Sequence, residues 1–513
     1  MNPRPAHAPH ALLPDLPFPS YGDYLAATGE DAVRKARATA PEALLAELTR
    51  SGLRGRGGAG FPTGVKWRGV REHPCPTKYV VCNAAEGEPG TFKDRYLLRS
   101  NPYATLEGML IAAHAIGATR GYLALKASFR RELARVRTAL EEMKQACDGF
   151  VIEVVEGPEE YLFGEEKALL NVIEGDGPLP READNPPYEV GLFATPGSQN
   201  PALVNNAETY AHVPSIVRHG AESFREVGTS DTPGTVIFTI SGDVARPGVY
   251  EREAGTTLRE LIFDAAGGLG EGLQLKAILC GVSTAVIEPD KLDTPADFGH
   301  LAAIGAGLGS AGFIVYDERR SAARIAQSVA RFLFVESCNQ CSACKTNLGL
   351  ASAALDELAG GVSGAGASDL ADRAVFSARH APQANRCYLP VQGSIIIPSL
   401  VKRFRADFDE VARTDEILIP KMIDFDEVHH TFSYDDQQPR KLPSWTYRDA
   451  PPSGRSPVEP MEPMEPMKLP RPVKVTLEPD IVAGLRAHGG ESQLGAQANA
   501  ALRAWLAEKA SRS

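Results

Sequence analysis

The sequence is poor in cysteine and has no long hydrophobic run. Eight cysteines among 513 residues are too few for the disulfide framework that stabilises small secreted domains. No stretch approaches the ~18 consecutive apolar residues of a membrane-spanning helix, and the proline-rich N-terminus lacks the continuous apolar core of a signal peptide. These absences predict a cytoplasmic protein that does not insert into the membrane.

Positive charge is also in deficit. The 54 Lys and Arg residues are outnumbered by 65 Asp and Glu, which gives a formal net charge of -11. This balance argues against nucleic-acid binding over the whole surface, although a local basic patch stays open. The length corresponds to roughly three to four domains at about 150 residues each, and the composition is that of a soluble globular protein.

The pattern of expected helices and strands changes twice along the chain. Up to about residue 230, apolar strand candidates at 78–83 and 121–125 alternate with helical segments such as 106–116, which favours an α/β sheet. Residues 235–316 are typical of a small α+β module. Residues 322–412 are mostly helical, apart from a glycine-rich interruption.

The C-terminal part begins with a proline-rich stretch, residues 453–472, in which EPM occurs three times. Such a segment cannot form a core, so we interpret it as an extended linker. Residues 473–477 then alternate as a short strand, and helices are expected at 480–487 and 492–508.

Four of the cysteines form the strongest constellation: Cys338, Cys341 and Cys344 in a CxxCxxC loop, and Cys387 further along. Three thiolates in one loop suit an iron–sulfur cluster, and a fourth from a distant segment would complete its ligands. Zinc is the chemical alternative, and buried inert thiols are the other. The remaining four cysteines are scattered and are interpreted as small packed side chains.

A glycine-rich loop, GRGGAGFPTGVKW, runs from Gly55 to Trp67. Its glycines would let backbone N–H groups approach a phosphate or a flat ring closely, and Lys66 adds a positive charge. The loop matches neither the Walker A pattern nor GxGxxG after a strand. A flexible surface loop therefore remains an alternative.

Three further segments carry clustered polar groups. They are NAAEGEPGTFKD at 83–94, YLFGEEKAL at 161–169 and VNNAET at 204–209. In the second, a helix opening after glycine would hold its carboxylates near the positive end of the helix dipole. In the third, paired asparagine amides could contact a ribose or a phosphate. Each segment alone also fits an ordinary turn or helix N-terminus.

Together and in this order, these motifs and the SCNQCSACK loop resemble the NADH-binding flavoprotein subunit of respiratory complex I. They resemble equally the diaphorase subunits of NAD-linked formate dehydrogenases and NAD-reducing hydrogenases. The resemblance covers about residues 45–415, and residues 235–316 are similar to the soluble-ligand-binding (SLBB) β-grasp domain. It implies an α/β multidomain protein with a Rossmann-like FMN domain, a ubiquitin-like β-grasp domain and a helical-bundle [4Fe–4S] domain.

The resemblance and the linker together predict six parts. They are an N-terminal lead-in at 1–45, an FMN/NADH-binding α/β domain at 46–230, the β-grasp domain at 231–321, a helical iron–sulfur domain at 322–415, an extended proline-rich linker at 416–470, and a small ribbon-helix-helix-like module at 471–513.

The resemblance implies an NADH:acceptor oxidoreductase of the NADH dehydrogenase (quinone) type. NADH would give a hydride to FMN, and single electrons would pass to the cluster. A flavin must mediate between NADH and the cluster, because a hydride carries two electrons and iron–sulfur centres accept one at a time. The open alternatives are a diaphorase subunit of a formate dehydrogenase or hydrogenase, and a non-catalytic regulatory protein with a DNA-binding tail.

One cluster alone is an incomplete electron path, so partner subunits are expected. These are a thioredoxin-like [2Fe–2S] subunit and a further iron–sulfur subunit, in a complex lying peripherally on the inner face of the membrane.

The resemblance also assigns roles by motif match. The FMN-binding residues would be Gly55, Arg56, Gly57, Gly58, Lys66, Asn83, Glu86, Gly164, Asn205 and Asn206. Those on the NADH side would be Phe61, Glu88, Glu165 and Glu166. Glu88 and Lys66 are expected nearest the reaction, with Glu88 placing the nicotinamide rather than moving a proton. The four cysteines above would bind the cluster.

Several positions depart from the family pattern. Ala85 stands where an Asp is usual, Phe163 replaces a Cys, and Ala343 replaces the Pro before the third cluster cysteine. No cluster ligand is lost, so these changes indicate a divergent branch with altered cofactor affinity or redox potential.

The C-terminal segment 471–513 has six basic and four acidic residues, which makes it slightly positive. It loosely resembles ribbon-helix-helix antitoxin modules, whose paired strands can enter the DNA major groove. Lys474 and Thr476 would then face outward. Dimerisation or protein docking is favoured over DNA contact.

Overall fold

The computed structural model describes residues 10–182, 187, 189–409, 411, 418–419, 421–438 and 441–443. The predicted ribbon-helix-helix-like module and the repeated EPM segment lie outside the described residues. Within these ranges, no helix combines the length and the apolar character needed to cross a bilayer.

Three helices precede the glycine-rich loop: α1 (Tyr21–Thr28), α2 (Ala32–Arg37) and α3 (Pro41–Ser51). α3 begins at Pro41, where the missing N–H costs no helical hydrogen bond. α1 and α2 were not predicted. Tyr24 and Val33 are buried in the same core as the following α/β domain, so the lead-in packs as part of that domain.

The first domain is built on a four-stranded parallel sheet with the order β3-β2-β1-β4. Its strands are β1 (Tyr79–Asn83), β2 (Arg120–Lys126), β3 (Ile152–Gly157) and β4 (Ala202–Asn206). The strands predicted at 78–83 and 121–125 are confirmed by β1 and β2. The arrangement is consistent with a Rossmann-like domain.

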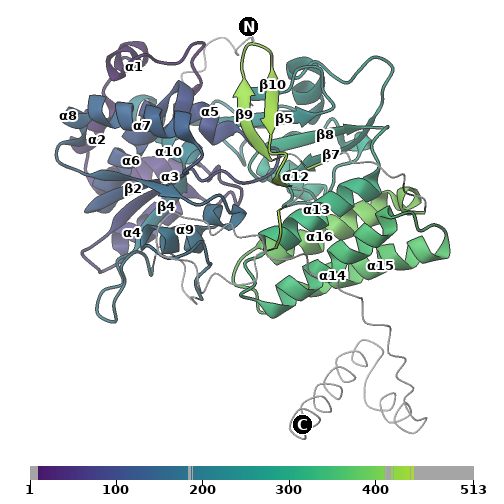
Figure 1. Ribbon diagram of the computed structural model, residues 1–513. Coiled ribbons are helices and arrows are strands. Elements are labelled where there is room, and N and C mark those ends of the chain that lie inside the picture. Colours follow the sequence, from purple (N-terminus) through teal and green to yellow (C-terminus); the bar gives the residue numbers. More distant parts are fainter. Residues whose placement is uncertain are drawn as a thin grey trace, which may run out of the picture. The chain divides into compact units, whose positions relative to one another are not determined.

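Helices surround this sheet (Figure 1). They are α4 (Thr63–Glu72), α5 (Lys93–Ser100), α6 (Pro102–Ile116), α7 (Arg130–Glu142), α8 (Lys144–Cys147), η1 (Tyr161–Gly164), α9 (Glu166–Ile173), α10 (Ala207–His219) and α11 (Ala221–Arg225). Alternation along β1 divides the core between the two faces, because successive side chains point to opposite sides of a sheet. Val80 lies in the core shared with α6 and α10, and Val81 in the core shared with α9.

Strand order places a topological switch point at one edge of this sheet. The first strand, β1, has β2 on one side and β4 on the other, so the connections run in opposite directions from it. In open α/β sheets, ligands bind outside the carboxyl ends of the strands at such a switch point. Asn83 and Asn206 end β1 and β4 there, in register with each other.

The second sheet has the order β6-β5-β8-β7, with β5 and β8 parallel and the outer pairs antiparallel. Its strands are β5 (Thr235–Gly242), β6 (Gly248–Glu253), β7 (Leu275–Cys280) and β8 (Gly312–Asp317). A wide π-helical segment, η2 (Glu260–Ala265), follows β6. Two short helices, η3 (Pro289–Lys291) and α12 (Phe298–Ala303), follow it.

Four helices that pack side by side form the third part (Figure 1). They are α13 (Ala322–Glu336), α14 (Ser342–Ala359), α15 (Ala365–His380) and α16 (Leu389–Arg403), and the short η4 (Arg405–Phe408) follows. The glycine-rich interruption predicted from the sequence lies between α14 and α15. The helical character expected for this region is confirmed.

The chain after the bundle is not an extended linker throughout. β9 (Met422–Asp426) and β10 (Thr431–Tyr434) form an antiparallel hairpin. Phe425 and Phe432 are buried in the core of the first domain with ring centroids 4.5 Å apart. The extended linker predicted at 416–470 is therefore wrong over the hairpin, because two buried aromatic side chains anchor it.

Candidate functional site

The glycine-rich loop joins α3 to α4 and lies against the end of β4. A Cβ on Gly57 would come within 3.2 Å of Asn206 Cβ, and one on Gly60 would overlap the Phe298 ring. Gly58 has a φ of 122°, which L side chains rarely adopt. Gly55, where a Cβ would be in ordinary contact with the Phe61 carbonyl oxygen, completes the loop. The sequence thus uses glycine where backbone and side chains approach closely.

Arg56 belongs to this loop, but its side chain turns inward. Its Nη2 donates to the carbonyl oxygens of Pro233 and Thr235 at 2.8 and 3.1 Å. Burial lowers the pKa of Arg56 to about 10. The guanidinium therefore anchors the loop to the start of β5, and only the backbone of Arg56 lies in the glycine-rich loop.

Asparagines line the switch-point edge. Asn83 Nδ2 donates to the Gly164 carbonyl oxygen at 2.8 Å, and Asn206 Nδ2 donates to Asp94 at 2.6 Å. Asn205, in the orientation that satisfies both ends of its amide, accepts from Trp67 Nε1 at 2.8 Å. Asn83, Asn206 and Gly164 therefore meet at one edge, whereas Asn205 contacts the base of the loop.

A buried charge cluster holds Asn206 in place. Lys93 Nζ lies 2.7 Å from Asp94, 2.9 Å from Glu208 and 2.9 Å from Asn206 Oδ1. Burial raises the pKa of Asp94, and the positive charge of Lys93 opposes that rise. Since Glu208 also accepts from the backbone N–H of Ile237, the cluster links the first domain to β5.

Lys66 lies on α4 and pairs with Glu166. Its Nζ is 2.6 Å from the Glu166 carboxylate and 2.7 Å from the Val204 carbonyl oxygen. The predicted residues Lys66 and Glu166 are therefore brought together as an ion pair. Beside them, a Cβ on Gly164 would meet no atom within 4 Å, so the space there is open. Phe61, at the tip of the loop, is 46% exposed.

Two of the predicted acidic residues have structural partners. Glu86 pairs with Arg95 at 2.8 Å and accepts from the backbone N–H of Asp94 at 2.9 Å. Glu165 is the N-cap of α9 and accepts from the backbone N–H of Ala168 at 2.8 Å. Burial raises the pKa of Glu165 to about 7. The predicted helix start at the GEE sequence is confirmed.

Glu88 sits where three parts of the chain meet. Its buried carboxylate accepts from the Tyr161 hydroxyl at 2.5 Å and from the backbone N–H of Val282 at 2.7 Å. The Tyr161 hydroxyl in turn accepts from Gln392 Nε2 on α16 at 2.8 Å. Burial raises the pKa of Glu88, although these hydrogen bonds oppose the rise. The first sheet, the second sheet and the bundle are therefore joined at this carboxylate.

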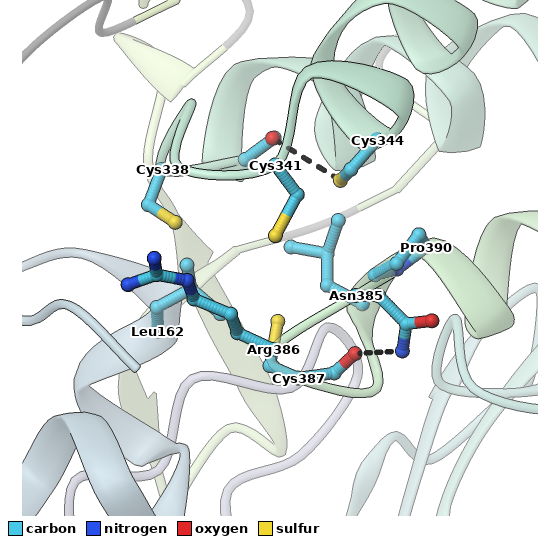
Figure 2. A pocket seen from close by; sticks show the side chains of 10 residues that line it. Leu162, Cys338, Cys341, Cys344, Asn385, Arg386, Cys387 and Pro390 are labelled. Carbon is cyan, nitrogen blue, oxygen red and sulfur yellow. Dashed lines mark hydrogen bonds between the residues drawn. The ribbon is translucent and has the colours of Figure 1, made fainter. Parts of the chain in front are cut away.

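The four predicted cysteines surround one hollow, whose lining is shown in Figure 2. Cys338 and Cys341 lie in the loop between α13 and α14, Cys344 lies in the first turn of α14, and Cys387 lies just before α16. The thiols of Cys338, Cys341 and Cys387 point into the hollow. It holds about 260 Å³ of space free of atoms, part of which is open to solvent.

The arrangement of these thiols around a hollow favours an iron–sulfur cluster over zinc. Among the described residues, no three His, Cys, Asp or Glu side chains converge closely enough to hold a single metal ion. A cluster places several irons and sulfides between its thiolates, so sulfurs around a hollow fit a cluster better than zinc. Burial raises the pKa of Cys344 to about 11, and an electropositive iron centre would offset that cost.

One short segment reaches both sites. Leu162 lines the cysteine hollow, and Gly164 accepts the hydrogen bond from Asn83 at the sheet edge. η1 and the start of α9 therefore lie between the switch-point edge and the cysteines.

Sequence reasoning missed several residues of the site. Tyr161 stands three residues before the GEE motif, and its position could have suggested a role. Lys126 directly follows the predicted strand 121–125 and is the last residue of β2, at the carboxyl edge where ligands bind. Gln392 lies on a helix remote in sequence and carried no signal.

Comparisons with known proteins agree with this geometry. Residues 48–215 match the Nuo51 FMN-binding domain family, and residues 237–279 match the SLBB domain family. The F 2 subunit of the NADH-quinone oxidoreductase of Rhizobium meliloti (strain 1021) is 38% identical over 337 residues, covering 63% of this chain and 79% of that protein. The HndC subunit of the NADP-reducing hydrogenase of Solidesulfovibrio fructosivorans is 35% identical over 337 residues, covering 64% and 68%.

A solved structure is also similar. The air-oxidized NAD+-reducing [NiFe]-hydrogenase matches with a TM-score of 0.66 and 33% identity, over 76% of this chain and 66% of the hydrogenase chain. The present chain thus spans slightly less than two thirds of that relative. The chain belongs to the family of NADH-binding FMN flavoprotein subunits that includes the F subunits of NADH-quinone oxidoreductases.

Proposed function

We propose that this chain binds FMN at the switch-point edge and a [4Fe–4S] cluster in the cysteine hollow, and that it oxidises NADH. The observation that carries the proposal is the position of η1 and α9. Gly164 lies at the asparagine edge, and Leu162, two residues earlier, lines the hollow. One short segment contacts both predicted cofactor sites. A flavoprotein of this family with that arrangement is suited to passing electrons from one cofactor to the other.

The residues at the sheet edge suit FMN. Gly57 and Gly58 remove side chains from the loop, and the open space beside Gly164 leaves room for a flat ring. Asn83 and Asn206 end two neighbouring strands there, and each amide carries both donor and acceptor groups. The side of the FMN site formed by the loop would be completed by Gly55, the Arg56 backbone and Lys66. Glu86 and Asn205 would act indirectly, Glu86 through its ion pair with Arg95 and Asn205 through its hydrogen bond from Trp67. FMN when bound supplies the conversion of a hydride into single electrons.

The same arrangement provides a place for NADH. Phe61 offers an exposed ring, on which a base can stack. Glu88, fixed by Tyr161 and Val282, would accept a hydrogen bond from the nicotinamide carboxamide and so orient that ring. Glu165 and Glu166 would border the nucleotide from the start of α9.

The cluster and the domain limits are part of the same proposal. Cys338, Cys341, Cys344 and Cys387 would ligate the cluster in a helical domain at 322–415, with the FMN domain at 46–230 and the β-grasp domain at 231–321. The charge linkage through Glu208 and the Arg56 contacts support a functional unit of FMN and β-grasp domains.

Electrons would leave through partner subunits that carry iron–sulfur centres, because the described part of the chain provides ligands for one cluster. A complex I-type assembly, peripheral to the membrane, is the first candidate. A hydrogenase-linked assembly is the second, favoured by the similarity to a hydrogenase subunit and to a hydrogenase structure. The tail segment 471–513 stays a predicted docking or dimerisation module.

An anaerobic preparation of the full chain tests the proposal. We expect one FMN and about four irons per chain, the ratio of a single [4Fe–4S] cluster, together with NADH-dependent reduction of ferricyanide. A colourless protein that takes up neither FMN nor iron on reconstitution would contradict it. Co-purification with a formate- or hydrogen-oxidising subunit would favour the second assembly over the first.

A further inference from the structure

Lys126 is a buried lysine at the same edge of the first sheet. It is the last residue of β2 and is 2% exposed. Its Nζ lies 3.2 Å from the position that a Cβ on Gly87 would occupy, and the Tyr161 ring lies 3.3 Å from the same position. The ammonium group is therefore next to the segment that carries Glu88.

The other basic side chains of this edge already have partners. Lys66 pairs with Glu166 at 2.6 Å, Lys93 with Asp94 at 2.7 Å and Arg95 with Glu86 at 2.8 Å. Within the described residues, no hydrogen bond or ion pair is formed by Lys126 Nζ. Its Nζ lies 6.0 Å from the centre of the Phe129 ring, and no carboxylate of the described residues lies within ion-pair distance.

An unpaired buried charge is costly, because removing an ion from water carries a penalty of several kcal/mol. Burial, followed by the positive charges of Lys421 and Arg95, lowers the pKa of Lys126 to about 8, while Glu159 and Glu336 oppose this. At neutral pH the group is still mostly protonated. A cation held in this way is suited to an anion that arrives with a ligand.

We propose that Lys126 binds a negatively charged group of a bound cofactor at this edge, either of FMN or of NADH. The inference rests on the proposed function and adds a residue that the sequence motifs did not assign. Both cofactors carry phosphate groups, and the reduced flavin ring can carry a negative charge as well. Gly87 leaves the approach to the ammonium free of a side chain.

Binding measurements on the full-length protein test this. Lys126→Met removes the charge and keeps most of the stem, Lys126→Arg keeps the charge, and Lys144→Met is the control at an exposed lysine. FMN affinity is measured by flavin fluorescence on the apoprotein, and NADH affinity by titration of the FMN-loaded protein under anaerobic conditions.

We expect Lys126→Met to weaken one of the two affinities by about tenfold or more, which is about 1.4 kcal/mol. Lost FMN affinity identifies the flavin as the source of the anion, and weakened NADH affinity with FMN retained identifies the dinucleotide. Lys126→Arg and Lys144→Met should stay within about threefold of the wild type.

The stability of the apoprotein separates ligand binding from a structural role. Removing an unpaired buried charge should leave the thermal midpoint of apo Lys126→Met at or above that of the wild type. A lowered midpoint with both affinities within about twofold of the wild type would overturn the proposal. If Lys126→Met does not fold, Lys126→Gln is measured in the same way. A wild-type chain that binds no FMN would contradict the proposed function itself.

Discussion

The Tyr161 hydroxyl lies 2.5 Å from Glu88 Oε2 and donates a hydrogen bond to it. The same tyrosine donates its backbone N–H to Glu336, the last residue of α13, at 3.0 Å. Tyr161 therefore holds the carboxylate proposed for the NADH side and the helix that leads into the cysteine loop.

Tyr161→Phe removes the donor and leaves the Glu88 carboxylate less satisfied, so we expect a loss of about 1–3 kcal/mol in the free energy of unfolding. The pKa of Glu88 is already raised by burial and should rise further. A raised carboxyl pKa means that the folded state binds more protons, so stability falls as pH rises above the unfolded value. The loss should thus be larger at pH 8 than at pH 5 in urea unfolding.

The matched control is Tyr79→Phe, at the first residue of β1, whose hydroxyl makes no hydrogen bond within the described residues. It should cost little at either pH. Equal losses for the two variants, or no dependence on pH, would count against the role given to the Tyr161 hydroxyl.

Gly164→Ala tests the open space at the sheet edge. A Cβ there meets no protein atom within 4 Å, so the apoprotein should unfold at the wild-type temperature. A bound flavin would occupy that space, and we expect FMN affinity to fall about tenfold or more. Gly197→Ala, where a Cβ is equally free, is the control and should bind FMN normally. Normal FMN binding by Gly164→Ala would place the flavin elsewhere.

Cys387→Ser tests the fourth cluster ligand. Thiolates hold iron–sulfur clusters and a serine hydroxyl is a poor replacement, so we expect loss of most of the iron and of the broad visible absorbance, with FMN retained. Cys147→Ser changes a half-buried cysteine outside the hollow and should keep the full iron content. A Cys387→Ser protein with unchanged iron and spectrum would remove Cys387 from the ligand set.

The pKa of Lys126 predicts a pH dependence of cofactor binding. As pH rises through about 8 the ammonium loses its charge, and the affinity for the anionic cofactor should fall with it. Lys126→Arg stays charged over this range, so its affinity should remain flat between pH 7 and 9.5. Isothermal titration at four pH values measures this, and parallel curves for the two proteins would contradict it.

Phe425→Ala tests whether the β9–β10 hairpin is a structural part of the first domain. The side chain is 4% exposed and packs on Phe432, so its removal should cost about 3–5 kcal/mol of unfolding free energy. Val428→Ala, in the turn of the same hairpin and 82% exposed, should be nearly neutral. A neutral Phe425→Ala would restore the interpretation of this segment as a linker.

Local signals were enough to predict much of the fold. The apolar run at 78–83 marked β1, and the GEE sequence marked the start of α9. Each depends on residues next to one another in the sequence. The family motifs likewise brought Asn83, Asn206 and the glycine loop together.

What the sequence could not provide depends on tertiary packing. The hairpin is held by Phe425 and Phe432 against a core built far earlier in the chain, and its own strands are short. The Glu88–Tyr161–Gln392 contacts join segments about 70 and 230 residues apart. The neighbouring residues in the sequence did not distinguish Lys66, which forms an ion pair, from Lys126, which forms none, because the counter-charges come from other elements.

The short segment from Leu162 to Gly164 has a consequence for how the two proposed redox centres keep their separation. Two residues of chain span at most about 7 Å, and this length is fixed by covalent bonds rather than by the docking of domains. A rotation of the bundle about the first domain would have to break either the packing of Leu162 at the cysteine hollow or the hydrogen bond from Asn83 to Gly164. The electron-tunnelling distance between the proposed centres would therefore depend on these two contacts, and a change in either one would alter the rate of internal electron transfer.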